Sequence, residues 1–536
     1  MNDQPLDYAN VNAAAEPVSV RKPMRVWPAI AICVLAVLVL VGFWVWPDVL
    51  RQNRILLSQL ACIIVAALLI VWLLFVSRLP GRTRLMAFGG LIVIAAAVGG
   101  SIRRIEYSGD MWLVPVWRWS PEADLAGAIT SAESAAKTAD DGVDFTRITD
   151  DDYPRFLGPR GDGIIPGVSL APDFSAHPPE LLWRQPIGRG WSSFAVANGF
   201  AVTQEQRDDK ELVVCYEVAT GRVRWVHTDD ASFDKPPSGA GPRATPTLAD
   251  SRVYTFGVTG ILNCLEDATG EPVWSVNVVE DGGKMSAWGK SSSPLLVDNL
   301  VVVSAGGTDG NSLVAYDRYT GERVWRGGDR RSGYASALVA TLAGVRQIVI
   351  LNANGVTGHD PTDGHVLWDH PWGQSINVSQ PVPIGDDQLF VSTGYGEGCA
   401  LLRLATDDDG KFTVTETWRN RNIKAKFTNV VRRGDDLYGL DDGILVCLDV
   451  GTGKRKWKRG RYGHGQALLF DNVLLIQAES GDVVLVDATP EGHHELSRFP
   501  ALDAKTWNHP AYWQGHLLVR NDQEAACYRL PINTAE

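Results

Sequence analysis

Side chains able to contact a flat or anionic ligand recur in eight similar stretches of the chain. Each stretch, from GWSSFAV at residue 190 to WNHPAYW at residue 507, starts with small or polar residues and continues into an apolar run. Aromatic rings there could stack on a flat ring, and Arg243, Lys290 and Lys426 could hold carboxylates. We therefore predict this ligand-facing set: Trp191, Ser192, Arg243, Trp288, Lys290, Tyr334, Asn377, Gln380, Lys426, Asn429, His464, Trp507 and His509.

The same stretches contain no Asp or Glu, which argues against metal-assisted oxidation. Calcium needs several oxygen ligands, some of them charged, and a catalytic base must lie within hydrogen-bond reach of its substrate. Glu205 and Glu397 lie on other segments and could reach in. We assign no catalytic residue and no metal site. His359, His365 and His370 are close in sequence but lack a fixed ligand spacing, and we interpret the first two as exposed turn residues.

A repeated eight-residue motif must position these stretches. VATGRVRW, DATGEPVW, RYTGERVW and VGTGKRKW share a Thr-Gly turn followed by a tryptophan. Gaps of 39 to 51 residues separate the tryptophans, and four strand-like runs within each gap are typical of a β-propeller blade. Cysteine recurs before the turn, at Cys215, Cys264, Cys447 and Cys527, and we interpret it as a small buried strand residue. The structural repeat tryptophans are Trp183, Trp225, Trp274, Trp325, Trp368, Trp418 and Trp457.

Eight first strands predict an all-β, eight-bladed propeller, with seven blades as the alternative. The last blade has no fourth strand of its own at the C-terminus, so ELLWRQP (Glu180 to Pro186) is predicted to complete it and to close the ring. First strands run nearest the propeller axis, which is why their starts are the candidate ligand site. His464 and His509 are then hydrogen-bonded channel residues, or proton carriers if there is proton chemistry.

The N-terminal part predicts a membrane region. Residues 1–25 form a cytoplasmic tail, and residues 26–104 contain apolar stretches at about 26–46, 56–76 and 85–102, each long enough to span a bilayer. Arginine and lysine before the first stretch and between the second and third place the N-terminus inside, so three spans put the remainder outside. If the third stretch does not span, the remainder is cytoplasmic. Residues 105–152 are an interfacial segment and linker, with a helix starting at Ser120 and an acidic spacer, and residues 153–531 are the propeller.

These motifs carry a family resemblance. The A-x-T-G-x-x-x-W repeat resembles that of the pyrroloquinoline-quinone (PQQ) dehydrogenases and their non-catalytic relatives. YPRFLGPRGDG, followed by LLWRQPIGRGWSSFAV, resembles the start of membrane-anchored PQQ-like propeller proteins. The resemblance implies a PQQ-like propeller fold. It does not by itself imply the cofactor, because the β-propeller lipoprotein of the outer-membrane barrel-assembly machinery has the repeat and binds no PQQ.

We therefore predict a multi-pass inner-membrane protein whose extracytoplasmic propeller binds a protein, peptide or carbohydrate partner without a cofactor. The alternative is a PQQ-dependent alcohol or sugar dehydrogenase, which would need PQQ with Ca²⁺. A formal net charge of -12 gives no general attraction for nucleic acid.

Overall fold

The computed structural model describes residues 23–46, 49–119, 142–373 and 376–533, which fall into two compact units. The first unit contains the described residues up to Ile105 together with Asp110–Trp119. The second contains Glu106–Gly109 together with the described residues from 142 onward. Most of the predicted cytoplasmic tail, and the helix predicted to start at Ser120, lie outside the described residues.

The first unit is built on three apolar helices. They are α1 (Trp27–Val45), α2 (Arg51–Val71) with its π-helical continuation η1 (Trp72–Val76), and α3 (Gly81–Ser101). With 19, 26 and 21 residues, each is long enough to cross a bilayer core of roughly 30 Å. The chain then forms a two-stranded sheet of β1 (Ile102–Tyr107) and β2 (Leu113–Trp117).

The second and third helices begin earlier than the sequence predicted. The second starts at Arg51 rather than Leu56, and the third at Gly81 rather than Leu85. Arginines occupy these first turns, and their long side chains can reach a polar interface while the backbone is already helical. A count of apolar residues alone therefore misses the first turn of these two helices.

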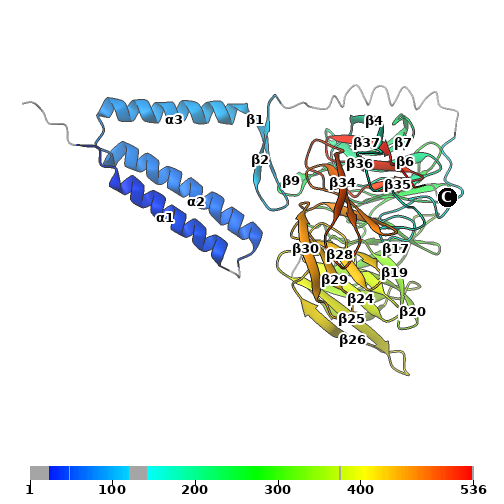
Figure 1. Cartoon of the computed structure of the whole chain (residues 1–536). Coiled ribbons are helices and arrows are strands. Elements are labelled where there is room, and N and C mark those ends of the chain that lie inside the picture. Colours follow the sequence, from blue (N-terminus) through cyan, green and yellow to red (C-terminus); the bar gives the residue numbers. More distant parts are fainter. Residues whose placement is uncertain (1–22, 47–48, 120–141, 374–375, 534–536) are drawn as a thin grey trace, which may run out of the picture. The chain divides into compact units, whose positions relative to one another are not determined.

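The second unit is an eight-bladed β-propeller, as predicted (Figure 1). Each blade is built on four antiparallel strands that are consecutive in the sheet. Blades one to four are β5 (Ala195–Ala197), β6 (Phe200–Arg207), β7 (Lys210–Glu217) and β8 (Val223–Asp229); β11 (Thr247–Ala249), β12 (Arg252–Phe256), β13 (Ile261–Glu266) and β14 (Pro272–Asn277); β15 (Leu295–Val297), β16 (Leu300–Ser304), β17 (Leu313–Asp317) and β18 (Arg323–Gly327); and β19 (Leu338–Leu342), β20 (Val345–Asn352), β21 (Gly355–His359) and β22 (Val366–Pro371).

The remaining blades follow the same order, and three further strands are short. Blades five to eight are β23 (Val382–Ile384), β24 (Gln388–Thr393), β25 (Gly398–Thr406) and β26 (Phe412–Asn420); β27 (Val431–Arg433), β28 (Asp436–Asp441), β29 (Ile444–Asp449) and β30 (Arg455–Arg461); β31 (Gln466–Phe470), β32 (Val473–Gln477), β33 (Asp482–Asp487) and β34 (Glu495–Pro500); and β35 (Ala511–Trp513), β36 (His516–Arg520), β37 (Glu524–Arg529) and β4 (Glu180–Pro186). Strand β3 (Ile164–Ile165) pairs in parallel with β31, and β9 (Asp234–Lys235) pairs with β10 (Gly239–Ala240).

The repeat motif joins each blade to the next. Trp225 lies opposite Cys215 within blade one, where the small side chain leaves room for the ring, and a bulge follows at once. The ring donates from Nε1 to the carbonyl of Asp267 in the next blade at 2.7 Å. It also packs on the Thr-Gly turn there, because a Cβ on Gly270 would lie 2.5 Å from the ring. Glycine is therefore required at that turn both by its positive φ and by the neighbouring tryptophan.

The ring of blades is closed by a clasp between the two ends of the propeller. Strand β4 lies beside β37 (Figure 1) and pairs with it antiparallel. Within this pair Trp183 lies opposite Cys527. The Trp183 Nε1 donates to the carbonyl of Val218 in blade one at 2.7 Å, so the clasp uses the same joint as the other blades. The predicted role of Glu180 to Pro186 is confirmed.

The propeller unit begins earlier than the predicted boundary at residue 153. Val143 and Phe145 are buried against the first two blades. The Phe145 N–H donates to the Asp267 carboxylate at 2.6 Å. The end of the predicted acidic spacer is therefore part of the propeller core, because its two apolar residues fill a gap between blades.

Candidate functional site

The propeller axis has two chemically different ends. First strands of neighbouring blades contact each other around it, as β5 does with β11 and β35. Because strands alternate in direction, the turn between the second and third strands returns to the end where the first strand starts. We call that end the axial mouth and define it by Trp191, Phe427, His464 and Trp507.

Aromatic rings line the axial mouth in a continuous cluster. The Trp507 ring centroid lies 4.9 Å from that of Trp191 and 5.0 Å from that of Phe427, which in turn lies 5.5 Å from the His464 ring. Lys505 places Nζ 4.4 Å from the centroid of the Trp507 ring. Such contacts combine apolar area with cation–π attraction, so the mouth offers rings and ammonium groups together.

A carboxylate from a neighbouring turn organises this cluster. Glu479 lies between β32 and β33 and accepts from Trp507 Nε1 at 3.0 Å and from the His464 backbone N–H at 2.9 Å. Its Oε1 also accepts from the Gly109 N–H at 2.7 Å. Both carboxylate oxygens of Glu479 are thus already engaged by N–H donors.

The chain's own residues Glu106–Gly109 meet the mouth. Lys426 donates from Nζ to the Gly109 carbonyl, and Lys505 donates to the Tyr107 carbonyl at 3.2 Å. Lys505 also lies 3.6 Å from the Glu106 carboxylate. The lysines at the mouth therefore meet main-chain carbonyls and an acidic side chain.

Two other predicted cations are held by backbone carbonyls. Arg243 donates to the carbonyls of Gly241 and Gly239, and Lys290 donates from Nζ to those of Lys284 and Ala305. Burial lowers the pKa of Arg243 to about 10 and that of Lys290 to about 8. These hydrogen bonds hold the loops at the mouth in place. They also occupy donors of the two cationic groups that were predicted to hold ligand carboxylates.

Trp288 and Tyr334 form a second aromatic pair of the predicted set. Their rings stack with centroids 5.3 Å apart, and both side chains are partly exposed. The Trp288 N–H donates to the Tyr334 hydroxyl at 3.3 Å. The pair offers a flat surface to a ligand.

Further along the first strands of blades three to six lies a cavity of about 490 Å³, which we call the chamber. Its walls are mostly apolar, with Leu157, Leu338 and Val382 among them, and Arg155 and Asp162 come from the segment that precedes the clasp. Arg155 donates from Nε and Nη2 to the Pro159 carbonyl, at 3.2 and 2.8 Å. Burial raises the pKa of Asp162 and lowers that of Arg155.

The remaining predicted site residues lie at the chamber or are buried in loops. Gln380 and Asn429 line the chamber, where Gln380 donates from Nε2 to the Gly161 carbonyl at 2.7 Å. His509 faces the same segment, with Nδ1 3.5 Å from the Tyr153 hydroxyl, and burial lowers its pKa to about 4. Ser192 and Asn377 are fully buried and bond to nearby carbonyls, so they support loops.

The acidic residues considered from the sequence do not reach the mouth as free ligands. Glu205 is fully buried and pairs with Arg207 at 2.7 Å, while Glu397 pairs with Arg419. Glu479 is the carboxylate that the sequence reasoning missed. It lies on a turn between second and third strands, and the rule of alternating strand direction could have placed it at the mouth.

Phe427 and Lys505 were also missed, although each stands beside a predicted residue in the sequence. Phe427 directly follows Lys426, and Lys505 lies two positions before Trp507. Which of two adjacent side chains faces the axis depends on how the loop before each strand twists. The spacing of residues along the repeat does not indicate this twist.

One predicted histidine interpretation is wrong. His359 is fully buried, not exposed, and contacts Thr357 Oγ1 at 2.9 Å and the Gly364 carbonyl at 3.0 Å. His365 is exposed as predicted, and its ring lies close to the carboxylates of Asp360 and Asp363. Asp363 already accepts the His365 N–H at 3.0 Å, so these carboxylates serve the repeat turn itself.

The carboxylate at the mouth is already engaged by donors of the chain itself. Within the described ranges, three His, Cys, Asp or Glu ligand atoms converge only at the exposed turn of Asp360, Asp363 and His365. Calcium prefers several oxygen ligands with more than one charge, whereas Glu479 is committed to three N–H donors. No catalytic step through PQQ with Ca²⁺ follows from these residues.

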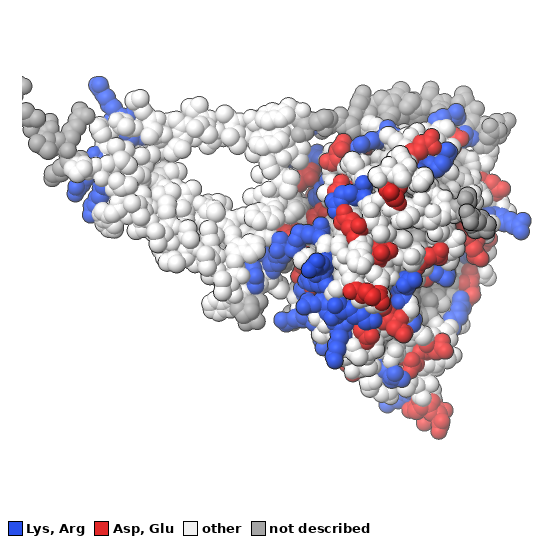
Figure 2. Space-filling view, in the orientation of Figure 1, with Lys and Arg blue, Asp and Glu red and all other residues white. Residues whose placement is uncertain are grey.

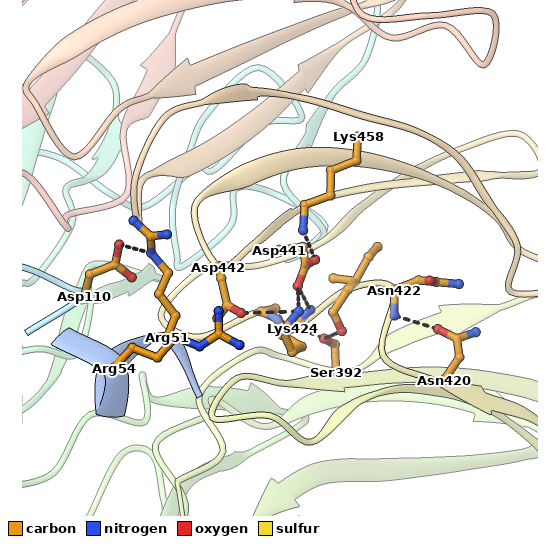
Figure 3. A network of polar contacts seen from close by, with 12 residues as sticks. Arg51, Arg54, Asp110, Ser392, Asn420, Asn422, Lys424, Asp441, Asp442 and Lys458 are labelled. Atoms are coloured by element: carbon orange, nitrogen blue, oxygen red, sulfur yellow. Dashed lines mark hydrogen bonds and ion pairs between the residues drawn. The ribbon is translucent and has the colours of Figure 1, made fainter. Parts of the chain in front are cut away.

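A basic edge marks the outer surface of blade six. Figure 2 shows lysine and arginine gathered around β30, whose sequence is RKWKRGR. Asp441 is 1% exposed and pairs with both Lys424 and Lys458 (Figure 3). The buried carboxylate thereby fixes the inner part of this edge, and the charges discourage pairing with another strand.

Comparison with known proteins agrees with this architecture. Residues 210–459 match the family model described as "Outer membrane protein assembly factor BamB". The propeller is of the PQQ-like type. A search of curated proteins gave no significant match.

Three solved structures illustrate the similarity. BamB from Moraxella catarrhalis is 16% identical over 67% of this chain and 99% of its own, with a TM-score of 0.48. Quinohemoprotein alcohol dehydrogenase from Comamonas testosteroni is 13% identical over 77% and 85%, with a TM-score of 0.41. Sqt1 from Saccharomyces cerevisiae is 10% identical over 66% and 99%, with a TM-score of 0.49.

Proposed function

We propose that this protein is a membrane-held extracytoplasmic propeller that binds a protein or peptide partner at its axial mouth. One observation carries the proposal. The polar groups at the mouth meet main-chain groups, since Lys426 and Lys505 donate to carbonyls and Glu479 accepts from N–H groups. Main-chain donors and acceptors are what any peptide offers, and the surrounding rings add apolar contact area.

The membrane part of the proposal rests on the helices and on charge. Three apolar helices with arginine and lysine before the first and between the second and third favour an inside N-terminus and an outside propeller. Protease treatment of intact spheroplasts tests this. Cleavage of the propeller in intact spheroplasts supports the orientation, and protection until the membrane is lysed contradicts it.

Peptide binding tests the function directly. Full-length protein in lipid nanodiscs is titrated with fluorescent peptides of defined sequence, and the Lys505→Met variant is titrated in parallel. We expect binding by the wild-type protein that weakens several-fold in the variant, because an ammonium group that meets carbonyls is lost. Equal binding by both proteins removes the mouth as the site.

The alternative is a PQQ-dependent oxidoreductase, for which the stacked and partly exposed pair Trp288 and Tyr334 gives some support. Incubation with PQQ and Ca²⁺, followed by quinone absorbance and dye-linked oxidation of alcohols and glucose, separates the two. We expect neither stoichiometric uptake nor turnover. Uptake with turnover would replace the binding function by an enzymatic one.

A further inference from the structure

The four residues Glu106–Gly109 occupy the axial mouth in the manner of a bound peptide. Gly109 is held at both of its main-chain groups, by Lys426 at its carbonyl and by Glu479 at its N–H. The carbonyl of Tyr107 receives a hydrogen bond from Lys505, 3.2 Å away. Three side chains of the mouth thus each bind a main-chain group of this short segment, and these hydrogen bonds hold it in a defined position.

Two features of the segment select its sequence. A Cβ on Gly109 would lie 2.0 Å from Cδ2 of the buried His464 ring, so the mouth admits glycine and rejects larger residues. Three positions earlier, the Glu106 carboxylate lies 3.6 Å from Lys505 Nζ. The surface is therefore complementary to an acidic residue followed, three positions later, by a glycine.

We propose that Glu106–Gly109 is an internal ligand of the axial mouth, and that the partner is a peptide segment with the same spacing of an acidic residue and a glycine. This rests on the proposed function and adds the class of partner and a means of regulation. The partner binds only when it displaces Glu106–Gly109. The mouth is thereby closed to peptides that lack either feature.

Tethering makes the internal ligand a strong competitor even if each contact is weak. Because Glu106–Gly109 belong to the same chain as the mouth, their binding there is intramolecular, and such ligands act at effective concentrations of up to the order of millimolar. The apparent affinity for an external ligand falls by the fraction of molecules in which the site is open. Opening the mouth by mutation should therefore strengthen binding of a matching external peptide by at least about tenfold.

A disulfide tests whether the segment occupies the mouth. In a Cys33→Ser, Cys62→Ser background, Gly109→Cys and His464→Cys are combined, because a Cβ on Gly109 would lie 3.0 Å from that of His464. Disulfides have Cβ–Cβ separations of about 3.5–4.5 Å, which a shift of a few tenths of an ångström or more provides. We expect the bond to form with mild oxidant in the full-length protein in nanodiscs, as read by mass spectrometry. The pair Gly492→Cys with His464→Cys is the control and should stay unlinked. If the Gly109→Cys and His464→Cys pair also stays unlinked, the proposal is overturned.

Peptide binding then tests what the occupied site recognises. The probe is a fluorescein-labelled peptide with the sequence of residues 104–111, RIEYSGDM. Gly109→Val opens the mouth by collision with His464, and Gly492→Val is the matched control, since the nearest atom to a Cβ there is 3.6 Å away. We expect the Gly109→Val protein to bind the probe at least about tenfold more tightly than the wild-type and control proteins. The oxidised disulfide variant should bind none and recover on reduction.

The outcomes separate this inference from the proposed function. If wild-type and Gly109→Val proteins bind the probe equally well, the mouth binds peptides but the segment does not compete, and only this inference fails. If the disulfide forms and the opened mouth binds no peptide, both fail. If a probe with valine in place of glycine binds the opened mouth as well as the original, the stated partner class is wrong.

Discussion

The axial mouth lies at the first strands of blades one and six to eight and the chamber along those of blades three to six, yet one is filled and the other is open. At the mouth, rings pack within about 5 Å of each other and every lysine named there meets a carbonyl or a carboxylate. The chamber holds about 490 Å³ between apolar walls. The difference teaches that equivalent first strands of different blades can present quite different chemistry to the axis.

The largest expected effect follows from removing a ring at the mouth. Trp507→Ala deletes the contacts to Trp191 and Phe427 and one hydrogen bond to Glu479. Large aromatic truncations in packed sites cost about 3–5 kcal/mol, and we expect about 3 because the ring is partly exposed. Thermal unfolding followed by circular dichroism measures the loss. Val324→Ala, at an exposed side chain, is the control, and an equal effect of both would show that the mouth is loosely packed.

A pH-dependent effect comes from Glu211, a buried carboxyl near Arg243. Burial raises its pKa from 4.5 to about 7. Between these values the folded protein binds more protons than the unfolded chain, so this contribution to stability is complete below pH 4.5 and is lost as pH rises through 7. One pKa unit corresponds to about 1.4 kcal/mol, so the loss is at most about 3.5 kcal/mol.

The Glu211→Gln variant isolates that contribution. Because glutamine does not titrate, this position no longer makes the variant's stability depend on pH between 5 and 8. The unfolding temperature of the variant should therefore rise relative to that of the wild type as pH increases. A difference that is constant with pH would mean that Glu211 is ionised in the folded protein throughout.

A smaller effect is expected when Glu479 loses its charge. Glu479→Gln keeps the shape but replaces one accepting oxygen by a donor, which then faces an N–H group. Hydrogen bonds to charged groups contribute about 1.5–3 kcal/mol, so we expect a loss of about 2. Urea unfolding of the propeller measures it. No measurable change would indicate that water replaces the carboxylate at the mouth.

The smallest effect is expected at the chamber. Arg155→Met removes a half-buried guanidinium whose pKa is lowered by burial, and leaves an apolar side chain of similar length. Because desolvation of the charge offsets much of its bonding, we expect a change of less than about 1 kcal/mol. A loss as large as that of Glu479→Gln would show that the chamber is as tightly organised as the mouth.

Much of the fold was predictable because the tryptophan repeat is a joint between blades. Its small opposite residue, its Thr-Gly turn and its ring all take part in one contact, so the spacing of Trp225 and its equivalents reveals the blade count. The clasp at Glu180 to Pro186 followed from the same count. Phe145 was harder, because two apolar residues in an acidic segment give no periodic pattern.

The site was less predictable, for physical reasons that particular residues illustrate. The aromatic residues Trp191, Trp288 and Trp507 were identified from their place at the start of first strands. Arg243 and Lys290 were identified by charge, but the structure satisfies them with carbonyls of nearby loops. Glu479 reaches the mouth from a turn between second and third strands, and Gly109 reaches it from a distant part of the chain to which no local spacing connects it.

The clasp also fixes the timing of folding. Arg184 in β4 meets Glu524 in β37, and 340 residues of chain separate them. At a synthesis rate of about 5–20 residues per second, β4 exists for roughly 20–70 s before its partner strand is made. During that interval it is an unpaired edge, and the entropy of closing so long a loop must be overcome before the last blade forms. The eighth blade is therefore the step at which a chaperone or a protease has the longest access to this protein.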